Sequence, residues 1–244
     1  MMKMLTFAKR NAKEILRDPL TLLFGLGFPI VLILLLSAIQ ASVPVDLFKI
    51  ESLTPGITVF GLSFMSLFSA TLISKDRSSA LLQRLYTTPL TALDFILGYT
   101  LPIIPISVAQ SLVCYAVALL IGLDLTVNIL FAILFIIPIS ILFIAIGLLC
   151  GSVLNDKQVG GICGALLSNV CAWLSGAWFD LELVGDAFKS TAYALPFVHA
   201  AEIEKAVLSG DFVGIFPHLW WVLAYTVILL ITAVYLFLRQ MKKQ

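Results

Sequence analysis

The chain has 244 residues, of which 61% are hydrophobic and 12% are charged, and its formal net charge is +1. A soluble domain averages about 25% charged residues. This composition and the mean hydropathy of +1.08 therefore exclude an ordinary soluble domain and indicate an all-α integral membrane protein. The net charge gives no sign of a nucleic-acid partner.

Residues 1–18 are predicted to form an amphipathic entry helix. At 100° per residue, apolar and polar side chains separate onto two halves of a helical wheel, and only Met2 and Asn11 are misplaced. The apolar half holds Met4, Leu5, Phe7, Ala8, Ala12, Ile15 and Leu16, and the polar half holds Lys3, Thr6, Lys9, Arg10, Lys13, Glu14 and Arg17. This pattern is typical of an interfacial helix lying in the membrane surface. A helix packed on a partner protein is the alternative.

Six uncharged runs each exceed the roughly 20 residues that a helix needs to cross a bilayer. They cover residues 19–45, 52–74, 95–123, 125–155, 158–179 and 212–238. We therefore predict one transmembrane domain over residues 1–244, with six transmembrane helices at about 20–41, 53–73, 95–121, 128–150, 159–179 and 215–238. The first run follows 18 charged and amphipathic residues, so we expect it to remain as a span and not to be cleaved as a signal peptide.

The basic residues predict the orientation, because cytoplasmic loops carry an excess of Lys and Arg. Twelve basic residues lie on the side of the termini, whereas only Lys49, Lys189 and Lys205 lie on the other side. Both termini are therefore predicted to be cytoplasmic. The twelve are Lys3, Lys9, Arg10, Lys13, Arg17, Lys75, Arg77, Arg84, Lys157, Arg239, Lys242 and Lys243.

The second and fifth spans carry local signals. Thr54 is predicted to cap the second span, with Pro55 at its first helical position. In the fifth span, small residues repeat every four positions, which lets another helix approach closely. The repeat comprises Gly160, Gly164, Ser168, Ala172 and Gly176. Its partner helix is either inside the subunit or across a dimer. The four cysteines lack metal-site spacing and are predicted to be packing residues.

The cytoplasmic loop, residues 74–94, is predicted to contain a helix of two turns. Leu81, Leu82, Leu85 and Tyr86 share one face of that helix. Thr88-Pro89 stops it, and Thr91-x-x-Asp94 reads as a capping box that opens the third span. Such a helix either docks on a cytoplasmic partner or lies on the bilayer surface.

The longest external segment, residues 180–214, is predicted to form a helical hairpin. Residues 190–201 are uncharged but too short to span a bilayer. A re-entrant or interfacial hairpin broken at Pro196 fits this length.

Catalytic chemistry is absent from the sequence. No phosphate-binding loop is present, and His199 and His218 alone cannot form a metal site. His199 and Glu202 share a helical face, which indicates hydrogen bonding more than metal binding. Among Asp, Glu, Lys, Arg and His, the six runs contain only His218, so ion coupling inside this chain is not expected. No catalytic, cofactor-binding or metal-binding residues are predicted.

Several short motifs resemble those of one family. They are Arg17-Asp18-Pro19, Pro55-Gly56, Asp76-Arg77 with Leu82, Arg84-Leu85, Thr88-Pro89-Leu90 and Gly98, then Ser175-Gly176, Leu195-Pro196-Phe197 and His199-Ala200. The loop is similar to the form D-R-x-x-G-T-L-x-R-L-x-x-T-P-L of type-2 ABC transporter permeases, chiefly the membrane subunits of bacterial exporters. Ser79-Ala80 replaces the usual Gly-Thr, Tyr99 stands where Lys is common, and the usual external Arg is replaced around residues 202–205. These departures leave the substrate undefined.

The resemblance implies a permease of the bacterial cytoplasmic membrane that is not itself an enzyme. Two ATP-binding subunits would hold ATP and Mg, and a second identical or similar permease would complete the transporter. The entry helix and a coupling helix in the loop would dock the ATP-binding subunit, and the hairpin would cap the substrate path. The implied docking residues are Asp76, Arg77, Leu81, Leu82, Arg84, Leu85, Thr88 and Pro89.

The family places the second and fifth spans at the substrate path. Polar or aromatic candidates there are Ser63, Ser66, Ser69, Asn169 and Trp173. The expected function is thus that of the membrane subunit of an ATP-driven exporter. A secondary transporter or channel, or a membrane scaffold, is the alternative.

Overall fold

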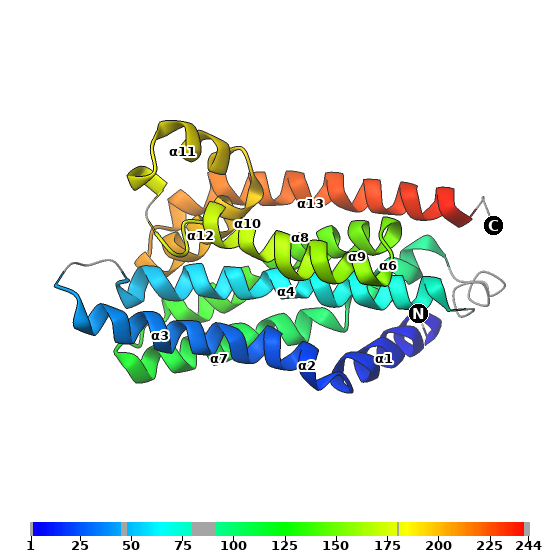
Figure 1. The fold of residues 1–244 in the computed structure, drawn as a ribbon, viewed down its shortest axis with the longest axis horizontal. Helices are drawn as coiled ribbons and strands as arrows, with labels where there is room; N and C mark the ends of the chain where they lie inside the picture. Colours follow the sequence, from blue (N-terminus) through cyan, green and yellow to red (C-terminus); the bar gives the residue numbers. More distant parts are fainter. Residues whose placement is uncertain (1, 45–47, 80–90, 180, 242–244) are drawn as a thin grey trace.

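The computed structural model describes residues 2–44, 48–79, 91–179 and 181–241, and this part of the chain is helical without a strand. Figure 1 shows the long helices running side by side along one axis. Both termini lie at one end of this bundle, called the terminal end below. Helices α11 and α12 lie at the opposite end, called the hairpin end.

The chain order follows the predicted plan. The first half contains α1 (Met2–Leu16), α2 (Pro19–Leu22), the π-helical η1 (Leu23–Gly27), α3 (Phe28–Ser42), α4 (Ile50–Ser78), α6 (Ala92–Thr100) and α7 (Ile103–Ile121). The second half contains α8 (Asn128–Val153), α9 (Asp156–Val159), the π-helical η2 (Gly160–Leu166), α10 (Leu167–Leu174), the 3₁₀ turn η3 (Leu181–Leu183), α11 (Asp186–Tyr193), α12 (Pro196–Ser209) and α13 (Phe212–Met241).

Five helical stretches of the described chain are long and apolar enough to cross a membrane, so the chain is a multi-pass membrane protein. They are Leu23–Ser42, Ile50–Ser78, Leu93–Ile121, Asn128–Val153 and Ile215–Phe237. They correspond to the predicted first, second, third, fourth and sixth spans. The predicted fifth span, 159–179, is the stretch α9–η2–α10, which is helical only as far as Leu174. Its crossing of the membrane stays a prediction.

Helix α4 is the central element of the bundle. In its most apolar window 89% of the residues are buried, against 17% for Ile215–Phe237. Its neighbour α8 approaches it closely at Gly147 and Gly151, which form a small-xxx-small pair. A Cβ atom added at Gly151 would lie 2.7 Å from the Ala70 carbonyl oxygen and 2.9 Å from the Ala70 Cα atom.

We expect Gly151→Val to destabilise the subunit by about 1–3 kcal/mol or more, because the added side chain meets backbone that cannot move aside. Thermal unfolding of the purified chain in detergent measures the effect. Gly160→Ala is the matched control, since a Cβ atom there meets nothing within 4 Å. Equal melting temperatures for the two variants would contradict the close α4–α8 approach.

The small-residue repeat of the fifth stretch has its partner inside the subunit. Ser168 lies 3.1 Å from Ser63 of α4, measured between their hydroxyl oxygens. A Cβ atom added at Gly164 would lie 3.5 Å from the Leu67 side chain, and Ala172 is buried. Gly160 has no such neighbour. The middle of the repeat therefore packs on α4.

The predicted cap of the second helix at Thr54 is wrong. Helix α4 begins at Ile50, after the extended Lys49, so Thr54 and Pro55 lie inside it. The Thr54 hydroxyl donates to the Ile50 carbonyl at 2.7 Å and does not cap the helix. The missing N–H of Pro55 removes one backbone hydrogen bond, a loss that membrane helices tolerate.

Two other local predictions are confirmed. The capping box at the third span is present: the Asp94 N–H donates to Thr91 Oγ1 at 3.2 Å, and the Thr91 N–H donates to Asp94 Oδ2 at 3.1 Å. The hairpin is also helical and broken at Pro196, the first residue of α12. Helix α12 packs against α4, α8 and α13.

Candidate functional site

The entry helix α1 packs part of its apolar half against the bundle, while Leu5 and Leu16 of that half are exposed. Phe7 and Ile15 are buried, whereas Lys9 and Lys13 are exposed. The Phe7 ring lies 5.8 Å from the ring of Phe95 and 5.0 Å from that of Tyr99, both on α6. The amphipathic assignment therefore describes a helix whose apolar face contacts α6.

A buried carboxylate joins α1 to the end of α4. Asp76 is only 1% exposed. Arg10 Nη1 and the Tyr99 hydroxyl both donate to Asp76 Oδ2, at 2.6 and 2.7 Å. The neighbouring Asn11 is fully buried, accepts from Arg10 Nη1 at 2.8 Å, and donates to the Gly98 carbonyl at 3.0 Å. We call Arg10, Asn11, Asp76 and Tyr99 the Asp76 cluster.

The residue after Asp76 binds a different element. The Arg77 guanidinium donates to the carbonyl oxygens of Gly151 at 3.1 Å and Leu154 at 2.9 Å, and also to that of Ser152. These carbonyls are at the C-terminal end of α8, where backbone acceptors lack partners within the helix. Arg77 therefore caps α8 as well as following Asp76 in the loop motif.

The other implied docking residues lie outside the described residues. They are Leu81, Leu82, Arg84, Leu85, Thr88 and Pro89, and the predicted two-turn helix falls in the same segment. The structure describes the two segments that flank the loop, namely the last turn of α4 and the helix α6. These two segments are called the arms of the loop below.

The candidate path residues fall into two groups. Ser63, Ser66 and Ser69 are fully buried inside the subunit. The Ser66 and Ser69 hydroxyls donate to the Phe143 and Ile144 carbonyls of α8 at 2.6 and 3.4 Å. Asn169 and Trp173 are instead exposed on α10. The structure therefore does not bring the five residues onto one surface.

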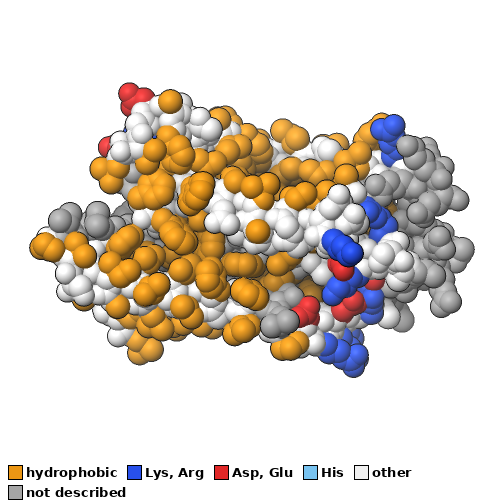
Figure 2. All heavy atoms as spheres, in the orientation of Figure 1, with side chains coloured by type: hydrophobic (Ala, Val, Ile, Leu, Met, Phe, Trp, Pro, Cys, Tyr) orange, Lys and Arg blue, Asp and Glu red, His pale blue; other side chains and the backbone are white. Residues whose placement is uncertain are grey.

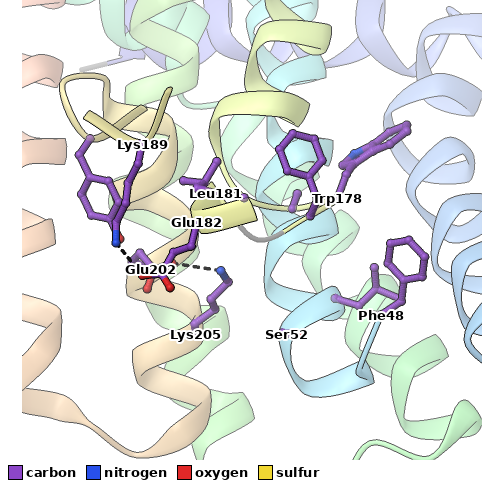
Figure 3. A pocket seen from close by; sticks show the side chains of 13 residues that line it. Phe48, Ser52, Trp178, Leu181, Glu182, Lys189, Glu202 and Lys205 are labelled. Atoms are coloured by element: carbon purple, nitrogen blue, oxygen red, sulfur yellow. Dashed lines mark hydrogen bonds and ion pairs between the residues drawn. The ribbon is translucent and has the colours of Figure 1, made fainter. Parts of the chain in front are cut away.

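A cavity of about 360 Å³ opens at the hairpin end. Figure 3 shows two ion pairs on one side of it, with Phe48 and Trp178 on the other. Lys189 Nζ lies 2.6 Å from Glu182 Oε1, and Lys205 Nζ lies 3.0 Å from Glu202 Oε1. The cavity wall therefore combines aromatic surface with balanced charge. The cavity could not be predicted from the sequence because its residues come from four separate segments.

A second buried carboxyl group lies on α12. Glu204 is fully buried, and its Oε2 accepts from the Tyr115 hydroxyl of α7 at 2.7 Å. Its Oε1 is buried without a hydrogen-bond partner. Burial raises the pKa of Glu204 to about 8, and the hydrogen bond from Tyr115 opposes this rise. The burial of Glu204 could not be predicted from the sequence, because Glu204 stands beside charged residues in a segment expected to be external.

The two histidines pair with each other. His199 Nδ1 lies 2.8 Å from His218 Nδ1, and His199 Nε2 lies 3.0 Å from the Tyr193 carbonyl oxygen. Because that carbonyl can only accept, Nε2 carries the proton of a neutral His199, and Nδ1 accepts from His218. Burial lowers the pKa of His199, which favours this neutral form. His199 therefore forms hydrogen bonds, as expected, but with His218 and Tyr193, whereas Glu202 pairs with Lys205.

The surface separates basic from apolar regions. Figure 2 shows Lys and Arg side chains gathered at the terminal end, while hydrophobic side chains cover most of the remaining surface in that view. Within the described part of the chain, no group of three or more His, Cys, Asp or Glu side chains is placed to hold a metal ion.

Comparison with known proteins identifies the family. A search of the curated proteins found no match. The family model described as ABC-2 type transporter matches residues 2–208, from α1 to the last turn of α12. The match includes the Asp76 cluster, the loop that follows it and residues 180–208 of the hairpin. This chain belongs to the ABC-2 type transporter family, as a membrane-spanning subunit of the permease kind.

Proposed function

We propose that this chain is the membrane subunit of an ATP-driven exporter and docks a separate ATP-binding subunit at its terminal end. The proposal rests on the contacts that α1 makes at the terminal end. The entry helix α1 is fixed between the two arms of the cytoplasmic loop, within a region rich in basic side chains. Family membership supports the association with an ATP-binding subunit. ATP and Mg would bind that partner.

In this proposal the chain crosses a bacterial cytoplasmic membrane six times, with α9–η2–α10 as the fifth crossing and both termini in the cytoplasm. The twelve-to-three distribution of basic residues supports the orientation. The position of both termini at one end supports an even number of crossings. Residues 180–214 would then form an external hairpin whose α12 re-enters the bundle.

Cysteine labelling tests the orientation. We expect Asp186→Cys, at the exposed start of α11, to react with a membrane-impermeant maleimide in intact cells. The variant is made after the four native cysteines have been replaced. Lys13→Cys on the exposed face of α1 should react only after the cells are opened. The reverse pattern would invert the proposed topology.

Two of the candidate path residues suit an interface between two permeases. Asn169 and Trp173 are exposed on α10, and Trp173 is 56% exposed. The buried serines of α4 instead hold helices together within the subunit. We therefore place the path along the exposed side of α10, between this subunit and an identical or similar second permease, with two ATP-binding subunits beneath.

A secondary transporter is the second candidate function. Glu204 favours it, because a buried carboxyl group is the kind of side chain that proton-coupled transporters use. That carboxyl lies on α12, outside the six apolar runs, and its Tyr115 hydrogen bond gives it a structural partner.

Co-expression with an ATP-binding protein encoded in a neighbouring gene tests the proposed function. We expect the two proteins to co-purify, and the membrane chain to stimulate ATP hydrolysis when both are placed in lipid discs. Solute movement that needs no ATP but follows a proton gradient, without co-purification, would instead establish the second candidate.

A further inference from the structure

Asp76 lies where three segments of the terminal end meet. It is in the last turn of α4, close before residues 80–90 of the loop, and α6 begins just after that segment. Its Oδ2 atom receives one hydrogen bond from α1, through Arg10, and another from α6, through Tyr99. One buried oxygen atom thus joins all three helices.

Consecutive residues of α1 hold the two arms of the loop. Arg10 forms an ion pair with Asp76 on the arm before the loop, at 2.6 Å. Asn11 donates to the Gly98 carbonyl on the arm after it, at 3.0 Å. Arg10 Nη1 also donates to Asn11 Oδ1, so the two attachments are linked. The entry helix therefore bridges both sides of the loop.

The aromatic contacts of α1 do not supply the same connection. Phe7 packs on Phe95 and Tyr99, which both belong to α6. The Arg10–Asp76 ion pair instead connects α1 with α4. Loss of this pair should leave α1 attached to α6 while its position relative to the end of α4 becomes variable.

From this geometry we propose that Asp76 is a positioning residue that makes α1 and both arms of the cytoplasmic loop one rigid unit. A partner that moves either α1 or the loop would then move both, together with α4. The part of this inference that concerns a partner rests on the proposed function. The rigid unit itself is a property of this chain alone.

Pulsed electron paramagnetic resonance on the isolated chain tests the rigid unit. Nitroxide labels are placed at Lys13→Cys and Ser78→Cys, two exposed positions on α1 and α4, in a background without native cysteines. We expect a narrow distance distribution in lipid discs. Asp76→Ala and Arg10→Gln should broaden it, and Arg10→Lys should largely restore it because the charge is kept. Arg17→Gln, an equal charge change at the residue that follows α1, should leave it narrow. An unchanged width in Asp76→Ala and Arg10→Gln would overturn the proposal.

The complex with the ATP-binding subunit tests the transmission of movement. We expect the Arg10→Gln variant to co-purify with that subunit. Its stimulated rate of ATP hydrolysis should be lower than that of the unaltered chain by about fivefold or more. Broad label–label distance distributions together with full stimulation of ATP hydrolysis would show that Asp76 stabilises the fold without positioning the docking elements. That result would overturn the proposed positioning role of Asp76. If the unaltered chain binds no ATP-binding subunit, the proposed function fails, and the label distances alone decide whether the rigid unit exists.

Discussion

Replacing Glu204 with glutamine is expected to make the protein more stable near pH 8 and to remove the part of its pH dependence that arises from this carboxyl group. Glutamine keeps the shape of the neutral acid and accepts the hydrogen bond that Tyr115 donates at 2.7 Å. It cannot ionise, so the cost of a buried negative charge disappears.

The direction in which stability changes with pH follows from the two pKa values of the Glu204 carboxyl group, in the folded and in the unfolded chain. Burial raises its pKa from 4.5 to about 8 in the folded chain. Below pH 4.5 both the folded and the unfolded chain are protonated, and the stabilising contribution of this group is complete. As the pH rises through the interval up to about 8, only the folded chain keeps the proton, so stability falls by about 1.4 kcal/mol per pH unit. Above that interval the loss is complete.

Thermal unfolding in detergent at several pH values between 5 and 8.5 measures this slope. The difference between the parent chain and Glu204→Gln isolates Glu204, because every other ionisable group is the same in both. Glu202→Gln on the same helix is the matched control, since Glu202 is partly exposed and paired with Lys205. Tyr115→Phe should cost about 1–3 kcal/mol by leaving the buried carboxyl without its donor. Identical slopes for the parent and Glu204→Gln would refute the assignment.

Much of the architecture could be predicted because membrane helices are specified by uncharged length. The predicted spans 20–41, 53–73 and 128–150 lie within helical stretches that the structure places at 19–42, Ile50–Ser78 and Asn128–Val153. The capping box at Thr91 and the break at Pro196 could also be read directly, since both depend on residues close in sequence. The cap pattern of Thr54-Pro55 gave a wrong prediction because it lies inside a helix that begins one turn earlier.

The sites could not be predicted to the same extent, because their contacts join residues far apart in the chain. Asp76 carries a clear motif, yet its partners Arg10 and Tyr99 are 66 and 23 residues away. Asn11 gave the one available signal, a polar residue on the apolar half of the entry helix. Glu204 gave none, because its burial depends on how α12 packs against α4, α8 and α13.

The position of α4 connects the two ends of the molecule. Its last turn contains Asp76 at the terminal end, and its first residues, Ser52 and Leu53, line the cavity at the hairpin end. A single helix of 29 residues spans this distance and is closely packed along its length. In the proposed exporter, a movement imposed on the loop would therefore reach the cavity through this one helix.

The loop helix predicted for residues 74–94 should give the largest effect on assembly. Leu81, Leu82 and Leu85 share one face of that helix in the sequence, and each leucine contributes roughly 1.5–3 kcal/mol when fully buried in a partner's groove. Leu82→Asp removes one such contribution and places a charge in an apolar groove. We therefore expect the affinity for the ATP-binding subunit to fall by at least about tenfold.

Arg84→Ala is the comparison that distinguishes apolar docking from simple charge attraction. Exposed ion pairs are worth about 0–1 kcal/mol, so this variant should weaken the complex less than Leu82→Asp, and the remaining affinity should depend less on salt concentration. Co-purification at two salt concentrations, together with stimulated ATP hydrolysis in lipid discs, measures both effects. If Leu82→Asp keeps full assembly and full stimulation, the loop helix lies on the bilayer surface and the ATP-binding subunit must engage the chain elsewhere. The exposed basic face of α1, with Lys9 and Lys13, would then be the surface to alter next, because it lies at the same end of the molecule.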